Sequence, residues 1–252
     1  MDIDHLSYSS ISTYQRCPRK WKFRYIEKIP TLSSAPLAFG GAFHNTIEDY
    51  LIAGGDLRDH WQTRWTEKNE EEGVSFDPEE MDALFQQGLE MLASPSIAEG
   101  LTQIKPMWIG DQPMIEQKVS LEVENVPVPV IGYVDVITED HLPGDFKTSS
   151  RKWSISKAEN EIQPLFYLAA LEQSGMTLPE WTFRHYVFTK ANYEFQQLDS
   201  HFHPRQQEWL HQMVQNVWRG IENEVFFENP MSDWACSKNY CEYWTLCRGK
   251  YE

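Results

Sequence analysis

The sequence predicts an α/β fold in which the central strands carry the chemically active side chains. Three observations lead to this expectation. Residues 115–123 alternate as a strand does, and two apolar runs that flank a turn at residues 139–141 follow as a hairpin. A helical stretch comes next, and two further strand-like runs with flanking helices complete the order. Strands that alternate with helices in this way are typical of α/β proteins.

Composition limits the class of protein and its compartment. At 252 residues, of which 41% are hydrophobic, the chain can bury the core of one large domain, or of one domain with a satellite. No apolar run approaches the length of a membrane span, and residues 1–5 resemble no secretory signal. We therefore expect a protein of the reducing cytoplasm without a membrane partner, whose four cysteines bind metal or stay free rather than form disulfides.

The net charge of -16 argues against a protein that coats nucleic acid nonspecifically, since phosphate binding requires a basic face. It leaves room for an acidic enzyme with a local basic track. Lysines and arginines do cluster in two places, residues 16–28 and residues 147–157.

Helical spacing predicts helices over four ranges in the first half of the chain: residues 7–25, 39–53, 56–72 and 78–93. The first has a polar N-cap candidate at Ser9 or Ser10, and we expect Pro18 to break it. The second follows a Gly-Gly entry at residues 40–41. The third and fourth form a helical insertion, which we place at residues 56–100.

The second half predicts one helix over residues 156–174, paired strands over residues 181–189 and 194–200, and a long amphipathic helix over residues 204–227. The chain contains no repeat and no linker long enough to separate two folded domains. We therefore expect a single domain over residues 1–252.

The hairpin carries the charged groups from which the functional prediction starts. Asp145 and Lys147 are two residues apart in a strand, so the pleat directs both side chains to one face. Asp135 lies among apolar residues of the other strand, where a lone carboxylate is costly unless a charge neutralises it. Two carboxylates and a lysine suit a divalent cation with a water held beside it. The alternative is a surface hairpin with a simple ion pair between Asp145 and Lys147, and spacing alone favours neither interpretation.

Two further features have a functional and an ordinary interpretation. His44 is a candidate ligand for the same metal, although a histidine satisfied within the core or at the surface is the commoner case. Gln163 and Tyr167 are four residues apart, so one helical face presents an amide and a phenol soon after the hairpin. The alternative for that pair is ordinary packing.

The cysteines form the most specific pattern in the chain. Cys236, Cys241 and Cys247 have the spacing C-x4-C-x5-C in an aromatic tail, and Cys17 stands alone near the other end. Four thiolates with almost no nearby histidine suit an iron-sulfur cluster or a tetrahedral zinc ion, which would join the two ends of the chain. The alternative is four unrelated buried thiols.

Taken in order, these motifs resemble the PD-(D/E)XK nuclease superfamily. The resemblance lies in S-x6-C-P, a histidine in a Gly-rich helix, G-Y-V-D-V, D-F-K-T, Q-x-x-x-Y and a terminal cysteine triplet, and it spans residues 7–247. Within the superfamily the chain looks like the branch with an iron-sulfur cluster. That branch includes the nuclease domains of RecB and AddB and the CRISPR-associated adaptation exonucleases with their phage-encoded relatives.

The resemblance implies a restriction-endonuclease-like core, with a central mixed sheet flanked by helices. It also implies a Mg²⁺- or Mn²⁺-dependent DNA exonuclease that prefers single strands or free ends. Its pathway would be recombination, repair, phage DNA metabolism or CRISPR adaptation, whose proteins are the expected partners. The residues matching the family's site would be metal ligands, a water-positioning lysine and supporting polar groups: His44, Asp135, Asp145 and the carbonyl of Phe146 for the metal, Lys147 for the water, and Gln163 and Tyr167 in support.

The resemblance further implies a 4Fe-4S cluster, with zinc as the alternative, in a subdomain of residues 1–30 and 228–252. Its ligands would be Cys17, Cys236, Cys241 and Cys247. Two departures from the family pattern are visible. The first cysteine gap is four where the family more often has two, which leaves the cluster type open, and Asp145 stands where many relatives have Glu. The rival functions are a non-catalytic DNA-binding or adaptation-complex subunit, and a zinc-stapled enzyme of another chemistry.

Overall fold

The computed structural model describes residues 3–71, 78–178, 180–229 and 233–251. Residues 72–77 of the predicted insertion and residues 230–232 and 252 of the predicted cysteine-bearing tail lie outside this description. The protein divides into two compact units, and each is described by itself. We call residues 33–119 and 133–204 the sheet unit, and residues 1–32, 120–132 and 205–252 the cysteine unit.

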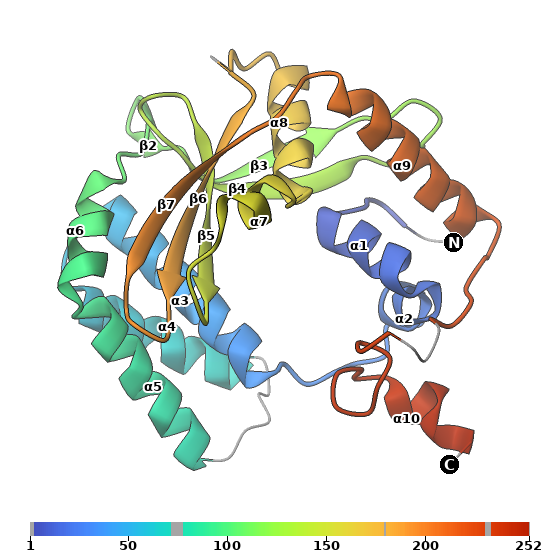
Figure 1. Ribbon diagram of the computed structural model, residues 1–252, viewed down its shortest axis with the longest axis horizontal. Helices are drawn as coiled ribbons and strands as arrows, with labels where there is room; N and C mark the ends of the chain where they lie inside the picture. Colours follow the sequence, from blue (N-terminus) through green and yellow to red (C-terminus); the bar gives the residue numbers. More distant parts are fainter. Residues whose placement is uncertain (1–2, 72–77, 179, 230–232, 252) are drawn as a thin grey trace. The chain divides into compact units, whose positions relative to one another are not determined.

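Five strands form one mixed sheet in the order β3-β4-β5-β6-β7 (Figure 1). Their bounds are Ile115–Leu121 for β3, Val130–Ile137 for β4, Pro143–Ser149 for β5, Thr182–Thr189 for β6 and Phe195–His201 for β7. The pairs β4-β5 and β6-β7 are antiparallel, and β5-β6 is parallel. The predicted hairpin, the two later strands and the α/β class are therefore confirmed.

The helices of the sheet unit fall on either side of the hairpin in the sequence. Their bounds are Ala35–Ala53 for α3, Leu57–Glu71 for α4, Pro78–Leu92 for α5, Pro95–Gln103 for α6, Ile155–Glu159 for α7 and Gln163–Gln173 for α8. A short strand pair that the sequence did not indicate, β1 (Trp108–Ile109) with β2 (Gln112–Pro113), precedes β3. Helix α6 was also not predicted.

Two helix predictions were wrong in their bounds. The predicted helix over residues 156–174 is two helices, because Asn160 caps α7 and Pro164 is the second residue of α8, where a missing backbone N–H costs nothing. The predicted Gly-Gly entry lies inside α3, which begins at Ala35 with proline in its first turn. Gly40 and Gly41 therefore have helical neighbours on both sides, although glycine weakens a helix interior.

The two faces of the sheet pack against different helices. Phe146 of β5 and Phe188 of β6 share a core with Phe43 of α3. Val187, which precedes Phe188 in β6 and pairs with Lys147, belongs to a second core with Trp153, the residue just before the N-cap of α7. Because successive residues of a strand point to opposite faces, α3 covers one face of the strands and α7 the other (Figure 1). The hairpin that carries the predicted acids is thus held between two apolar layers.

Helix α5 fits closely against α4. Trp61 is fully buried, and its indole N–H donates to the carbonyl of Phe85 at 3.1 Å. Gly88 lies against the ring, since a Cβ built there would be 2.1 Å from Cζ2 of Trp61. The glycine therefore lets the two helices approach each other.

The cysteine unit brings the ends of the chain together. It contains α1 (Tyr8–Arg16), α2 (Pro18–Trp21), the π-helical turn η1 (Lys22–Ile26), α9 (Gln206–Glu222), α10 (Trp244–Cys247) and η2 (Gly249–Tyr251). The hydroxyl of Tyr14 donates to the carbonyl of Val225 at 2.8 Å. A backbone bond of 3.1 Å runs from the N–H of Arg19 to the carbonyl of Phe227.

The first helix breaks at Pro18 as predicted, but its N-cap is Ser7 rather than Ser9 or Ser10. The Ser7 and Ser10 hydroxyls accept hydrogen bonds from each other's backbone N–H groups at 3.1 and 2.9 Å. The last long helix, α9, ends at Glu222, short of the predicted limit at residue 227. Within the described part of the chain, no helix is both long and apolar enough to cross a membrane.

Candidate active site

The hairpin buries the two predicted acids side by side. Its register pairs Val136 with Gly144, so Asp135 and Asp145 follow as the next positions on facing strands. Both aspartates are buried, with 4% and 3% of their surface exposed. Instead of pairing with the opposite backbone, the N–H of Phe146 donates to Oδ2 of Asp135 at 2.6 Å. The strands therefore part at the place where the two carboxylates lie.

The carbonyl of Phe146 shares this opening. In a β-strand the N–H and C=O of one residue point to the same side. Since the N–H of Phe146 reaches towards Asp135 on β4, its carbonyl oxygen faces the same gap. This orientation suits the carbonyl for the metal-ligand role that the sequence resemblance implied.

Lys147 lies at the centre of a polar chain. Its ammonium is 2.7 Å from Oδ2 of Asp145 and donates to Oε1 of Gln163 at 3.1 Å. The amide of Gln163 in turn donates to the hydroxyl of Tyr167 at 2.7 Å. Burial opposes the charged form of Lys147, but the carboxylates of Asp145 and Asp135 outweigh it and raise the pKa of the ammonium. The lysine is thus held charged and aimed by a strand and a helix.

Both interpretations of the Gln163–Tyr167 pair hold in part. The ring of Tyr167 stacks on Phe183 with centroids 5.8 Å apart, as ordinary packing would have it. Its hydroxyl nevertheless ends the polar chain that starts at Lys147.

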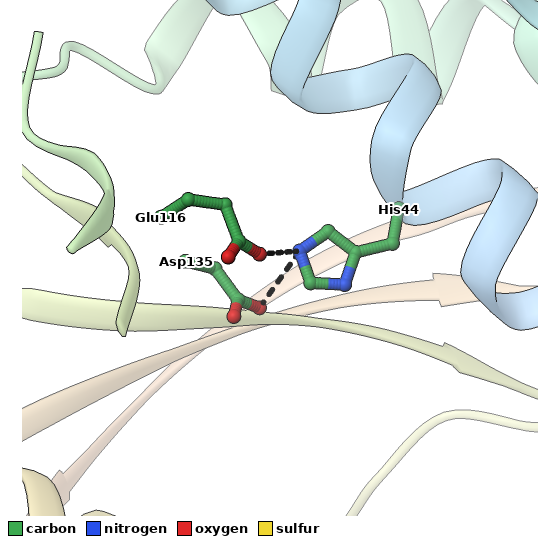
Figure 2. Close-up of side chains that lie close together, drawn as sticks. All are labelled: His44, Glu116 and Asp135. Atoms are coloured by element: carbon green, nitrogen blue, oxygen red, sulfur yellow. Dashed lines mark ion pairs between the residues drawn. The ribbon is translucent and has the colours of Figure 1, made fainter. Parts of the chain in front are cut away.

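His44 reaches the acids from α3. Its Nε2 lies 3.4 Å from Oδ2 of Asp135 and 3.7 Å from Oε1 of Glu116 (Figure 2). The same nitrogen lies 2.8 Å from Oε1 of Glu48. The imidazole edge also meets the ring of Phe146. His44 therefore points at carboxylates and not only into the apolar core.

Glu48 and Glu116 were not among the predicted residues. Glu48 follows His44 by four residues, a helical spacing that could have indicated it. Glu116 gave no comparable signal. It has a φ of 51° within β3, a left-handed conformation that is uncommon for glutamate and turns the side chain towards the site. Strain of this kind clusters at functional sites.

The described residues contain one set of three possible metal-ligand side chains with ligand atoms within 4.8 Å of one another, and it is His44, Glu116 and Asp135. The predicted ligand Asp145 is not part of this set, and its carboxylate pairs with Lys147. The structure thus brings together His44 and Asp135 as expected and adds Glu116.

The charges of the cluster suit a divalent cation. Burial raises the pKa of Asp135, and the carboxylate of Asp145 adds to this effect. Burial also raises the pKa of Glu116, which in addition hydrogen-bonds Glu48. For His44, burial lowers the pKa, but Asp135 and Glu48 overcome it and raise the value to about 9. A divalent cation, a hard ion that prefers oxygen ligands, would oppose these upward shifts in the pKa values of the two carboxylates.

The four cysteines line one cavity of about 230 Å³ in the cysteine unit. Arg16, Arg19, Lys20 and Arg248 line it as well, so a cofactor with anionic thiolates would meet compensating charge. The backbone N–H of Lys20 donates to Sγ of Cys17 at 3.4 Å. The structure therefore places the N-terminal cysteine in the same cavity as the C-terminal triplet.

The comparisons with known proteins agree with this geometry. The sequence matches the family model of the PD-(D/E)XK nuclease superfamily over residues 5–248, nearly the whole chain. The chain belongs to the PD-(D/E)XK nuclease superfamily. Its fold is similar to the crystal structure of a proposed exonuclease from Eubacterium rectale, with a TM-score of 0.59 and 13% sequence identity over 92% of this chain and 87% of that one. No curated protein matches the sequence.

Proposed function

We propose that this nuclease is a DNA exonuclease that hydrolyses phosphodiester bonds with Mg²⁺ or Mn²⁺ and prefers single strands or free ends. The observation that carries the proposal is the meeting of His44, Glu116 and Asp135 beside the Asp145–Lys147 pair. A phosphodiester resists attack because its oxygens are anionic. A cation at the three ligands, supported by Asp145 and the Phe146 carbonyl, would neutralise that charge and lower the pKa of a water.

The side chains around the cation site have separate roles. Lys147 holds the attacking water by donating a hydrogen bond to it, and its charge stabilises the negative charge that develops on the phosphate. Asp145 and Gln163 orient the ammonium, since both contact it within 3.1 Å. Tyr167 holds the amide of Gln163 by accepting its hydrogen bond. The carboxylate of Glu48 lies 2.8 Å from the same Nε2 of His44 that faces Asp135 and Glu116, so it stands at the edge of the cation site.

We further propose that Cys17, Cys236, Cys241 and Cys247 bind a 4Fe-4S cluster with a structural role. The thiols, the cationic lining and the shared cavity fit such a cluster. Zinc is the alternative, but tetrahedral Zn–S bonds of about 2.3 Å would hold the sulfurs roughly 4 Å apart. Among the described residues, no three of these sulfurs lie within 4.8 Å of one another. That spread favours a larger cofactor and a protein of the iron-sulfur branch.

A non-catalytic subunit of a DNA-binding or CRISPR-adaptation complex is the second candidate. Its support is the resemblance to that branch, and it would work in the cytoplasm with recombination or adaptation proteins. A non-catalytic subunit would not require an ammonium oriented by two side chains beside a cluster of acids, as that of Lys147 is. The exonuclease therefore has the better support.

Digestion of end-labelled DNA tests the proposal. Purified protein is incubated with single-stranded and blunt double-stranded DNA in Mg²⁺, in Mn²⁺ and in EDTA, beside an Asp135→Asn variant. We expect products only with metal, faster loss of label from the single strand, and no products from Asp135→Asn. If the protein bound DNA in the presence of metal but did not cleave it, the non-catalytic subunit would be the better explanation.

A further inference from the structure

Arg248 differs from its cationic neighbours in the cysteine cavity, by which we mean the cavity that the four cysteines line. Arg19 lies 3.5 Å from a carboxylate oxygen of Glu228, and Lys20 lies 2.6 Å from one of Glu242. Arg248 has no such contact within the described part of the chain. Glu228 is within electrostatic reach of it but pairs with Arg19 instead. The charge of Arg248 is therefore not neutralised by a direct contact with a carboxylate.

The guanidinium of Arg248 uses only part of one hydrogen-bonding edge. Its Nη2 donates to the backbone carbonyl of Asn229 at 3.0 Å, whereas its Nε is buried and has no hydrogen-bond partner among the described residues. Both N–H groups belong to one rigid, planar fork. Arg64 shows the full use of such a fork, since its Nε and Nη2 donate to the two oxygens of Asp49 at 2.6 and 2.7 Å. The fork of Arg248 thus has one donor left for an acceptor close to the Asn229 carbonyl.

The carbonyl of Asn229 also places Arg248 beside one of the cysteines. Sγ of Cys236 lies 3.6 Å from the same oxygen, to which its S–H can donate a weak hydrogen bond. Arg248 is in addition the residue that directly follows Cys247. It therefore adjoins two of the four proposed cofactor ligands, one at a shared carbonyl and one along the chain.

Metal binding changes the kind of hydrogen bond that Cys236 can form. A cysteine that binds a metal does so as a thiolate, which has lost its proton. The thiolate could no longer donate to the Asn229 carbonyl, and the oxygen 3.6 Å away would repel it. It would instead accept a hydrogen bond, and Nε–H of Arg248 is an unused donor on the edge that already reaches this carbonyl.

We propose that Arg248 positions the cofactor of the cysteine cavity by donating a hydrogen bond from Nε to the sulfur of Cys236 when that sulfur binds the metal. Nη2 keeps its bond to Asn229, so the fork spans the carbonyl and the thiolate. The inference rests on the proposal that the four cysteines bind a metal cofactor. For a 4Fe-4S cluster, Arg248 also raises the reduction potential, because a hydrogen bond to sulfur withdraws negative charge and favours the uptake of an electron.

Two measurements on full-length, anaerobically purified protein test the role of Arg248. The first is the midpoint reduction potential of the cluster, followed by its visible absorbance in a redox titration. The second is the rate at which bound metal passes to EDTA, and it applies to iron and zinc alike. We compare wild type with Arg248→Gln, Arg248→Lys and the control Lys238→Gln. Lys238 is exposed, lies two residues from Cys236 and is not among the residues that line the cavity.

Arg248→Gln should bind its added electron about tenfold more weakly, which for one electron lowers the midpoint potential by about 59 mV. It should also release its metal about tenfold faster, the effect of losing one hydrogen bond to a charged group. Arg248→Lys keeps the charge but loses the fork, so both values should lie between those of wild type and Arg248→Gln. Lys238→Gln should match wild type, although it removes the same charge from the same tail.

The outcomes separate this inference from the proposed cluster. If wild type is brown and Arg248→Gln has its potential and its rate of metal release, Arg248 only holds Asn229 and the inference is overturned, while the cluster stands. If wild type carries zinc, the cluster is refuted, and the rate of zinc release from Arg248→Gln decides the inference. Protein without bound metal would refute both. Should Arg248→Gln not fold, wild-type values for Arg248→Lys would show that the fork is not needed and would overturn the inference.

Discussion

Replacing Lys147 by alanine should separate the stability of the active site from its chemistry. The variant leaves the carboxylate of Asp145, which is 3% exposed, beside Asp135 without the ammonium 2.7 Å away. Breaking a buried ion pair costs about 3–5 kcal/mol. The side chain of Lys147 is 31% exposed, so water offsets part of the loss, and we expect the free energy of unfolding to fall by about 2 kcal/mol.

The chemical effect of the same change should be larger than the loss of stability explains. Removal of a group that stabilises charge in the transition state lowers the rate about a hundredfold, or about 2.7 kcal/mol in activation free energy. Mg²⁺ should restore part of the lost stability, since it replaces a positive charge beside the two aspartates, but it should not restore the rate.

Denaturant unfolding with and without Mg²⁺ and single-turnover cleavage of end-labelled single-stranded DNA provide the two measurements. The control is Lys105→Ala, which removes an exposed lysine from the same unit. A folded Lys147→Ala protein that cleaves within threefold of wild type would show that the lysine only neutralises Asp145, and the proposed mechanism would be wrong.

Three other predictions concern the metal ligands, the cysteines and the core. His44→Ala and Glu116→Gln should each raise the Mg²⁺ concentration needed for half-maximal cleavage while strand binding in EDTA stays unchanged; a change in thermal stability alone would assign both residues to the fold. Anaerobically purified protein should be brown with a broad absorbance near roughly 400 nm, and Cys17→Ala should lose colour and solubility together, whereas a colourless, active protein with one equivalent of zinc would contradict the cluster. Gly88→Ala should destabilise the protein by about 1–3 kcal/mol in a denaturant titration, because its methyl group would overlap Trp61; unchanged stability would mean that α5 shifts freely.

The sequence predicted those parts of the site that depend on periodicity within one element. The two-residue spacing of Asp145 and Lys147 places both on one face of a strand, and they form the expected pair. The four-residue spacing of Gln163 and Tyr167 places both on one face of α8, where they are hydrogen-bonded. These relations are fixed by backbone geometry alone.

Contacts between residues of different helices and strands could not be predicted as well from the sequence. Glu116 reaches His44 through a left-handed backbone conformation inside a strand, and no local pattern announces such a residue. Gly40 and Gly41 were predicted to lie at the entry of a helix, because glycine is common at helix ends. Their role inside α3 depends on the groups that approach from β5 and α4, which the sequence does not show. The break at Asn160 was missed for a similar reason, since an apolar pattern can continue across a turn.

The active site has a lysine half, Lys147 with Gln163, and a cation-binding half, His44 with Asp135. The length of chain between the two residues of each half affects the order in which the halves fold. Lys147 and Gln163 are 16 residues apart, so their half closes a short loop. His44 lies on α3, far earlier in the chain than Asp135 on β4, so the cation-binding half closes a much longer one. We expect the lysine half to assemble first and the cation half last, which would keep a partly folded chain from cutting DNA while it is being made. Pulse-labelled hydrogen exchange during refolding should then protect the amides of β5 and α8 before those of α3, and simultaneous protection would contradict this order.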